Sequence, residues 1–336
     1  MTEAPIAGTT TPVVRWDHLR RLTGPHGLFE HARYETPRLG HGYTTDDNAR
    51  ALVVLSRAGS DPAGLRPYLD FVLAARTGEG WHNRMSVDGG WTDRVGSDDA
   101  TGRAVWGLAE VISAGHEDKR VESAIVDGLG MSSRHLRATA YLLLGAAAAH
   151  RAGIAAAGRA LRSGLSRLPM PTAGRWFWPE PRLTYANARV PEALIRAGAA
   201  LDDAVVIDLG LTMLEWLVGI EWGETGFSFT PVRGRGPGER GPAFDQQPIE
   251  AWAMVDACAA AAAVDRSGEW ETLMQHAAMW FLGSNDGGVP LYDHETGAGF
   301  DGLTADGVNL NRGAESTLAA LGSVWSLQTA APRSRR

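Results

Sequence analysis

Apolar residues recur at helical spacing along most of the chain, in two kinds of segment that alternate. Segments of the first kind open with a polar cluster and continue with small and apolar residues, with almost no charge beyond the first turn. They occupy residues 44–55, 96–109, 131–144, 185–198, 244–257 and 310–324. A helix that is apolar on every side is buried on every side, so these segments predict an inner ring of six helices.

Segments of the second kind are amphipathic and predict an outer ring. They occupy residues 13–24, 65–76, 119–130, 154–168, 202–220 and 269–283. Four of them are followed by a glycine turn and a short aromatic stretch, at residues 78–85, 173–181, 224–231 and 285–293. Because glycine ends helices and aromatic residues favour extended structure, each stretch predicts a brief strand at the rim where the inner helices begin.

The alternation predicts an all-α fold, an (α/α)6 toroid of six inner and six outer helices with short β-like aromatic inserts on the active-site rim. Ordinary helical repeats would not place tryptophans in long loops between helices, which favours a closed ring. We expect one toroid domain over residues 12–326, with a flexible N-terminus at 1–11 and a flexible C-terminus at 327–336.

An acidic pair stands at the start of two inner segments, in TTDDNAR and in GSDDATGR. Thr45 and Ser97 are natural N-caps, and the helix dipole favours aspartate in a first turn. Pairing of Asp46 with Arg50, and of Asp99 with Arg103, would add a few tenths of a kcal/mol to the stability of each helix. Capping is therefore one interpretation of these residues.

Catalysis is the other interpretation, because the starts of all six inner helices face one cavity in a toroid. The carboxylates expected to meet there are Asp46, Asp47, Asp98, Asp99, Glu180, Asp245, Glu250 and Glu315. Carboxylates gathered in this way repel one another, so at least one should have the raised pKa that a general acid requires. We expect Asp47 and Asp99 to be catalytic, with Glu180, set between two prolines, as the rival general acid.

The aromatic inserts indicate a sugar ligand. Flat aromatic faces stack on the apolar faces of sugar rings, while carboxylates, amides and arginines bind hydroxyl groups. We expect Trp81, Trp176, Trp178 and Tyr185 to contact substrate. The polar residues expected to bind it are Asp46, Asp98, Arg103, Asn187, Asp245, Gln246, Glu250, Arg312 and Glu315.

Composition narrows the ligand class and the location. The net charge of −7 argues against binding to nucleic acid or to a membrane surface, which needs a basic face. The most apolar run, residues 251–264, contains Asp256 and is too short to span a bilayer, and the N-terminus shows no signal-peptide pattern. A single cysteine, Cys258, fits a reducing compartment. We therefore expect a cytoplasmic protein whose partner is an oligosaccharide or small sugar.

Four stretches, HGYTTDDNARAL, GSDDATGRAVWGL, WPEPRLTYANARVPEAL and FDQQPIEAW, resemble bacterial proteins of the six-hairpin glycosidase superfamily. Those proteins are often labelled glycosyltransferase and are sometimes associated with mannoside-processing genes. The resemblance extends over residues 26–325 and implies a carbohydrate-active toroid, without assigning its carboxylates. The sequence lacks the Rossmann glycine fingerprint or Asp-x-Asp motif of a nucleotide-sugar enzyme, which argues against the glycosyltransferase label.

We expect a glycoside hydrolase that cleaves a saccharide, mannose-containing if the resemblance holds, with inversion and without a metal or other cofactor. Toroid sites hold acid and base on opposite sides of a wide cavity, which leaves room for a water. No H-E-x-x-H or similar spacing indicates a catalytic zinc.

Several alternatives stay open from the sequence. An epimerase or isomerase of the same architecture would use cavity-facing histidines, for which the candidates are His31, His41, His82 and His135. A non-catalytic carbohydrate-binding or scaffold protein would bind without turnover. The arginines at the inner-helix openings either bind an anionic group or neutralise neighbouring carboxylates. The glycine-rich loop 233–247 is a lid or a surface excursion, and the oligomeric state is undetermined.

Overall fold

The computed structural model describes residues 13–172 and 174–330, and these residues contain twelve α-helices. The inner helices are α2 (Thr45–Arg57), α4 (Asp98–Ser113), α6 (Leu136–Arg151), α8 (Arg189–Leu201), α10 (Pro248–Val264) and α12 (Ala314–Ala330). The outer helices are α1 (Asp17–Leu22), α3 (Pro62–Ala74), α5 (Lys119–Leu129), α7 (Ala157–Arg167), α9 (Ala204–Glu221) and α11 (Glu269–Met279).

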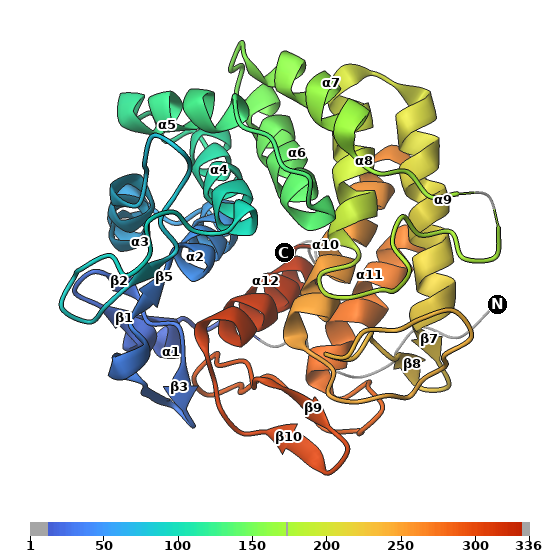
Figure 1. Cartoon of the computed structure of the whole chain (residues 1–336). Helices are drawn as coiled ribbons and strands as arrows, with labels where there is room; N and C mark the ends of the chain where they lie inside the picture. Colours follow the sequence, from blue (N-terminus) through green and yellow to red (C-terminus); the bar gives the residue numbers. More distant parts are fainter. Residues whose placement is uncertain (1–12, 173, 331–336) are drawn as a thin grey trace, which may run out of the picture.

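The inner helices form a closed ring (Figure 1). Each contacts the next in chain order, and α12 returns to contact α2. Each outer helix packs on one inner helix, with α1 against α12. The predicted (α/α)6 toroid is therefore confirmed. No helix within the described ranges combines the length and the apolar character needed to cross a lipid bilayer.

Short antiparallel strand pairs decorate the ring. They are β1 (Thr23–Gly24) with β2 (Gly27–Leu28), β3 (Ala32–Arg33) with β4 (Thr36–Pro37), β5 (Tyr43–Thr44) with β6 (Arg84–Met85), β7 (Trp222–Gly223) with β8 (Gly226–Phe227), and β9 (Gly302–Thr304) with β10 (Gly307–Asn309). Two of the four predicted aromatic inserts contain a strand. The described part of 173–181 and the stretch 285–293 contain none, because their prolines and glycines favour irregular loops.

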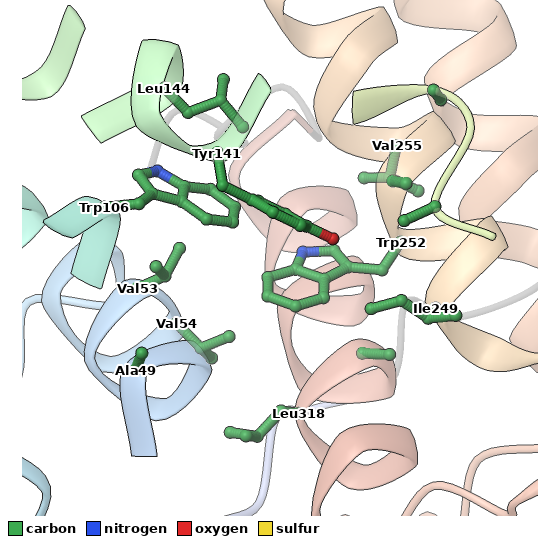
Figure 2. Close-up of a cluster of buried hydrophobic side chains, with 14 of the residues drawn as sticks. Ala49, Val53, Val54, Trp106, Tyr141, Leu144, Ile249, Trp252, Val255 and Leu318 are labelled. Atoms are coloured by element: carbon green, nitrogen blue, oxygen red, sulfur yellow. The ribbon is translucent and has the colours of Figure 1, made fainter. Parts of the chain in front are cut away.

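Aromatic side chains fill the centre of the ring. Trp106 of α4, Tyr141 of α6 and Trp252 of α10 project inward and stack, with ring centroids 6.1 and 6.3 Å from Trp106 (Figure 2). Each of the three is at most 2% exposed. They lie one to two turns beyond the starts of their helices.

A buried ionic network crosses the same central region. Arg57 of α2 pairs with Glu110 of α4 at 2.9 Å and with Asp256 of α10 at 3.0 Å. Arg189 of α8 pairs with Asp256 at 2.5 Å, and its guanidinium lies 4.6 Å from the Trp252 ring centroid. The prediction that inner helices carry almost no charge beyond the first turn is wrong here. The charged residues are tolerated inside the ring because they form ion pairs between helices. The pattern along a single helix does not show such pairs.

Glycine permits close contact between inner helices. A Cβ on Gly107 of α4 would lie 2.7 Å from the carbonyl oxygen of Ala49 on α2. A Cβ on Gly145 of α6 would lie 2.9 Å from the backbone nitrogen of Trp106 on α4. Neither position has room for a methyl group, so α2, α4 and α6 pack backbone to backbone and hold their N-terminal side chains at a fixed spacing.

The domain extends slightly further than predicted. The last inner helix runs to Ala330, beyond the expected boundary at 326, because residues 327–330 continue its helical pattern. The predicted flexible N-terminus at 1–11 and residues 331–336 lie outside the described ranges.

Candidate active site

A cavity of about 330 Å³ lies at the rim, between the starts of α2 and α12. Its lining residues are Glu30, His31, Thr44, Asp46, Asp47, Arg50, Asn83, Arg84, Gln247, Asp301, Asn309, Gly313, Glu315 and Ser316. A groove of about 380 Å³ between α5, α6 and α7 is lined by no carboxylate or histidine. The rim cavity is therefore the better candidate for acid–base chemistry.

The acidic pairs do not serve as the N-caps of α2 and α4. Thr44 is the N-cap of α2, because its hydroxyl accepts the backbone N–H of Asp47 at 3.2 Å. The predicted cap at Thr45 is one residue late, and the Thr45 hydroxyl instead donates to the carbonyl of His82 at 2.6 Å. Ser97 caps α4 as predicted. The caps are thus supplied by hydroxyl groups, which leaves the carboxylates to form other contacts.

Asp46 and Asp47 pair with different arginines. Asp46 accepts from Arg103 of α4 at 2.8 Å and from the amide of Asn83 at 3.3 Å. Asp47 accepts from Arg50 at 2.7 Å and from the hydroxyl of its N-cap threonine at 2.7 Å. The predicted pair of Asp46 with Arg50 along one helix is therefore replaced by an ion pair between helices, since Arg103 approaches from α4.

These contacts move the two pKa values in opposite directions. Burial raises the pKa of Asp47 to about 6, and the negative charges of Glu315 and Asp46 add to this against the opposing charge of Arg50. Burial would also raise the pKa of Asp46, but the charges of Arg103 and Arg50 outweigh it and lower the pKa. Adjacent carboxylates with divergent pKa values are typical of acid–base sites.

Arg50 joins α2 to α12. It is 6% exposed, and its second guanidinium nitrogen lies 2.6 Å from the carboxylate of Glu315, whose side chain is 37% exposed. Asp301, which precedes β9, accepts the backbone N–H of Gly313 at 2.7 Å. Burial raises the pKa of Asp301, and the charge of Glu315 adds to the effect. The charge of Glu315 thus acts on both Asp47 and Asp301 at the α2–α12 side of the cavity.

Asp99 lies beyond Arg103 and outside the cavity lining. Arg103 contacts Asp99 at 3.5 Å, as the predicted i,i+4 pair, and donates to the Tyr141 hydroxyl at 3.0 Å. The hydroxyl of Tyr185 donates to Asp99 at 2.6 Å. Burial and the charge of Asp99 raise the pKa of Tyr185. The two acidic pairs therefore meet through a shared arginine, but only the first faces the cavity.

Glu180, Asn187 and Glu250 lie together, away from the cavity lining. Arg137 forms an ion pair with Glu180 and donates to the side-chain oxygen of Asn187 at 2.7 Å. Glu250 accepts the backbone and side-chain N–H groups of Asn187 at 3.2 and 3.1 Å, and the backbone N–H of Ala186. Burial raises the pKa of Glu250 to about 8, and a second buried glutamate adds to it. These contacts organise the loop that leads into α8.

The predicted aromatic lining is not found at the cavity. Trp81 is fully buried and donates its indole N–H to the carbonyl of Val72 at 2.9 Å. Trp178 is 2% exposed and stacks on Trp216. Trp176 is half-buried. Tyr185 is exposed, and its hydroxyl is hydrogen-bonded to Asp99. The rings of Trp81 and Trp178 are buried against other core side chains, so they present no exposed face on which a ligand could stack.

Four further predicted residues lie elsewhere on or under the rim. Asp98 is exposed and accepts from a serine hydroxyl, and Asp245 is exposed. Gln246 is fully buried and donates to an aspartate at 2.6 Å. Arg312 pairs with Asp293 at 3.2 Å. The side chains of Asp98, Gln246 and Arg312 contact residues of neighbouring loops.

Several residues of the cavity lining were not predicted from the sequence. Glu30, Asn83, Arg84, Asp301 and Asn309 come from loops and short strands between the helical segments. Arg84 donates to both carboxylate oxygens of Glu30 at 2.9 and 3.2 Å. Asn83 and Arg84 lie in the predicted rim insert 78–85, from which only Trp81 was expected to contact substrate. Glu30, Asp301 and Asn309 lie between the predicted segments, where the pattern gave no signal.

One cluster has the composition of a metal site. Ligand atoms of Glu30, His31 and His41 lie within 4.8 Å of one another, and two imidazoles with a carboxylate suit a transition metal. However, both oxygens of Glu30 accept from Arg84. A cation would have to compete with that guanidinium, so the donor set does not fit a bound metal well.

Comparisons with known proteins bear on the fold. No protein-family model matches the sequence, and no curated protein matches it either. A sugar epimerase from a ruminal bacterium matches with a TM-score of 0.66 and 13% identity, over 91% of this chain and 94% of that chain. D-mannose isomerase matches with a TM-score of 0.69 and 10% identity, over 93% and 94%.

A hydrolase has the same architecture. An endoglucanase from Clostridium thermocellum complexed with cellotriose matches with a TM-score of 0.59 and 13% identity, over 91% of this chain and 64% of that chain. Identities this low establish a shared fold and no shared activity. The chain shares with these structures the (α/α)6 toroid fold that the alternation of its helical segments predicted.

Proposed function

We propose that this protein is a glycoside hydrolase for a short saccharide, with Asp47 as general acid and Glu315 as general base. The observation that carries the proposal is their shared contact with Arg50, at 2.7 and 2.6 Å, on the wall of one polar cavity. Structural neighbours named as epimerases, an isomerase and endoglucanases support a carbohydrate substrate.

The proposed reaction is a single displacement. Asp47, whose pKa of about 6 lets it hold a proton in mildly acidic solution, donates that proton to the glycosidic oxygen as the bond to the anomeric carbon breaks. Glu315, the more exposed of the two, accepts a proton from the water that attacks the anomeric carbon. The leaving sugar departs as an alcohol, and the new hemiacetal has the inverted configuration.

The remaining cavity groups are suited to binding. Asp46, held ionised by Arg103, accepts hydrogen bonds from sugar hydroxyls, and Asn83 and Asn309 offer amide donors and acceptors. A volume of about 330 Å³ is near the lower end of ligand pockets, which fits one or two sugar rings rather than a long chain.

The test is a screen of oligosaccharides, mannosides first, with the product anomer followed by NMR. Asp47→Asn and Glu315→Gln should each lower kcat by a factor of about 10² to 10⁴ while the fold survives. Asp99→Asn is the matched control, because Asp99 is an acidic first-turn residue outside the cavity lining. Full activity in both cavity variants, or a larger loss in Asp99→Asn, would contradict the assignment.

An epimerase or isomerase is the second candidate, and the position of His31 favours it. His31 lines the cavity and lies 4.8 Å, centroid to centroid, from His41. An imidazole there could remove a proton next to a sugar carbonyl. His82 and His135 do not line the cavity. Incubation of a reducing sugar in D₂O separates the candidates, because epimerisation incorporates deuterium at carbon and hydrolysis does not.

A further inference from the structure

Both arginines that line the cavity are already paired with carboxylates. Arg84 donates to both oxygens of Glu30, at 2.9 and 3.2 Å. Arg50 contacts Asp47 at 2.7 Å and Glu315 at 2.6 Å. Neither guanidinium is therefore free to receive an anionic ligand without giving up a carboxylate partner.

The arginine behind the lining is occupied in the same way. Arg103 is shared between Asp46 at 2.8 Å and Asp99 at 3.5 Å, and its side chain is only 6% exposed. Drawing it toward a ligand would leave two carboxylates short of a partner, and one of them, Asp46, faces the cavity. An unpaired buried charge is costly, so this arginine stays with its partners.

The lining also carries an excess of negative charge. It contains five carboxylates, of Glu30, Asp46, Asp47, Asp301 and Glu315, and two guanidinium groups. Asp301 takes a backbone N–H of Gly313 instead of an arginine. The excess remains when Asp47 carries its proton, because four carboxylates then accompany the two guanidinium groups of the lining.

We infer that the cavity takes uncharged or amino-bearing saccharides and rejects uronates and sugar phosphates. The ligand class rests on the proposed function, and the charge selectivity rests on the ion pairs. Sugar hydroxyls and ammonium groups donate to carboxylates, whereas a ligand carboxylate or phosphate would lose water and meet like charge. Arg50 and Arg103, at the openings of α2 and α4, thus serve the carboxylates and not an anionic substrate.

The first test compares charge forms of one sugar. Methyl glycosides of gluco, manno and galacto configuration are titrated calorimetrically as the neutral hexoside, the 2-amino hexoside, the uronoside and the 6-phosphate. We expect at least one neutral or amino form to bind, and its anionic counterparts to bind at least tenfold more weakly. An anionic form that binds as tightly as its neutral parent overturns the inference.

The second test uses inorganic phosphate and does not depend on the identity of the sugar. Glu30→Gln removes the charge that neutralises Arg84, so phosphate should bind this variant at least tenfold more tightly than the wild type. The double variant Glu30→Gln/Arg84→Gln should lose that gain. Glu79→Gln is the matched control, because Glu79 pairs with Arg94 at 3.2 Å on the exposed surface. An equal gain in this control, or no gain in Glu30→Gln, refutes the explanation.

The hydrolase activity and the selectivity against anionic sugars can be contradicted independently of each other. Binding of neutral sugars without hydrolysis of any glycoside would contradict the proposed function and leave the charge selectivity intact. Hydrolysis of neutral glycosides together with equally tight binding of uronosides would preserve the hydrolase and overturn the selectivity.

Discussion

Asp46 and Asp47 are consecutive in the chain, yet they pair with arginines of different helices, and their pKa values move in opposite directions. Side chains of neighbouring helical residues point about 100° apart, so one carboxylate turns toward α4 and the other toward α12. Two neighbouring aspartates thereby acquire different pKa values, as the division of roles between an acid and a hydroxyl acceptor requires.

The pH dependence of activity tests the role of Asp47. A general acid must be protonated, so kcat/KM should fall as the pH rises through about 6. In Asp47→Asn the residual hydrolysis of activated aryl glycosides, which need little protonation, should lose this limb. Asp46→Asn should keep the limb but move it to lower pH, because the charge of Asp46 helps to raise the pKa of Asp47. A limb that is unchanged in Asp47→Asn would assign it to another group.

The stability of the fold should fall with rising pH because of Glu250. Burial raises its pKa from 4.5 to about 8, so between these values the folded chain holds a proton that the unfolded chain releases. The stabilisation is complete below about pH 4.5 and is lost as the pH rises through about 8. Urea unfolding of Glu250→Gln at several pH values should show a flatter decline than the wild type. An identical slope would mean that Glu250 is ionised in the folded state.

Tryptophans at the centre and at the rim should differ in their effect on stability. Trp252 is 1% exposed and stacks on Trp106, so Trp252→Ala should cost about 3 to 5 kcal/mol of unfolding free energy. Trp176 is half-buried, and its replacement by alanine should cost clearly less. Denaturant titration of both variants checks the order. Equal losses would mean that the rim tryptophan supports the core as much as the central one.

Two helical glycines should respond oppositely to a methyl group. Gly107→Ala would place a Cβ 2.7 Å from a carbonyl oxygen of α2 and should destabilise the protein by about 1 to 3 kcal/mol. Gly219→Ala on α9 meets nothing within 4 Å and should stabilise it by about 0.5 to 1 kcal/mol, since alanine favours a helix. Melting temperatures of the two variants are sufficient to measure the signs. Stabilisation in Gly107→Ala would show that α2 and α4 can separate at little cost.

The sequence by itself determined the twelve-helix alternation and the rim on which polar side chains gather. These features follow from periodicity and from local turn chemistry, which neighbouring residues specify. Local rules also placed a cap at Ser97. Such properties depend on the few residues before and after each position, so a single sequence is sufficient to state them.

Only the tertiary structure decided which carboxylates share a cavity. Asp47 and Glu315 are brought together because α12 returns to α2 and both bind Arg50, whereas Asp99 turns to Tyr185 and Glu180 to an arginine of α6. The choice depends on the rotation of each helix and on loops such as the one carrying Asp301, which set distances between residues far apart in the chain. Helix-start patterns carry no information on those distances, so they identified the rim but not the residues that face one another across it.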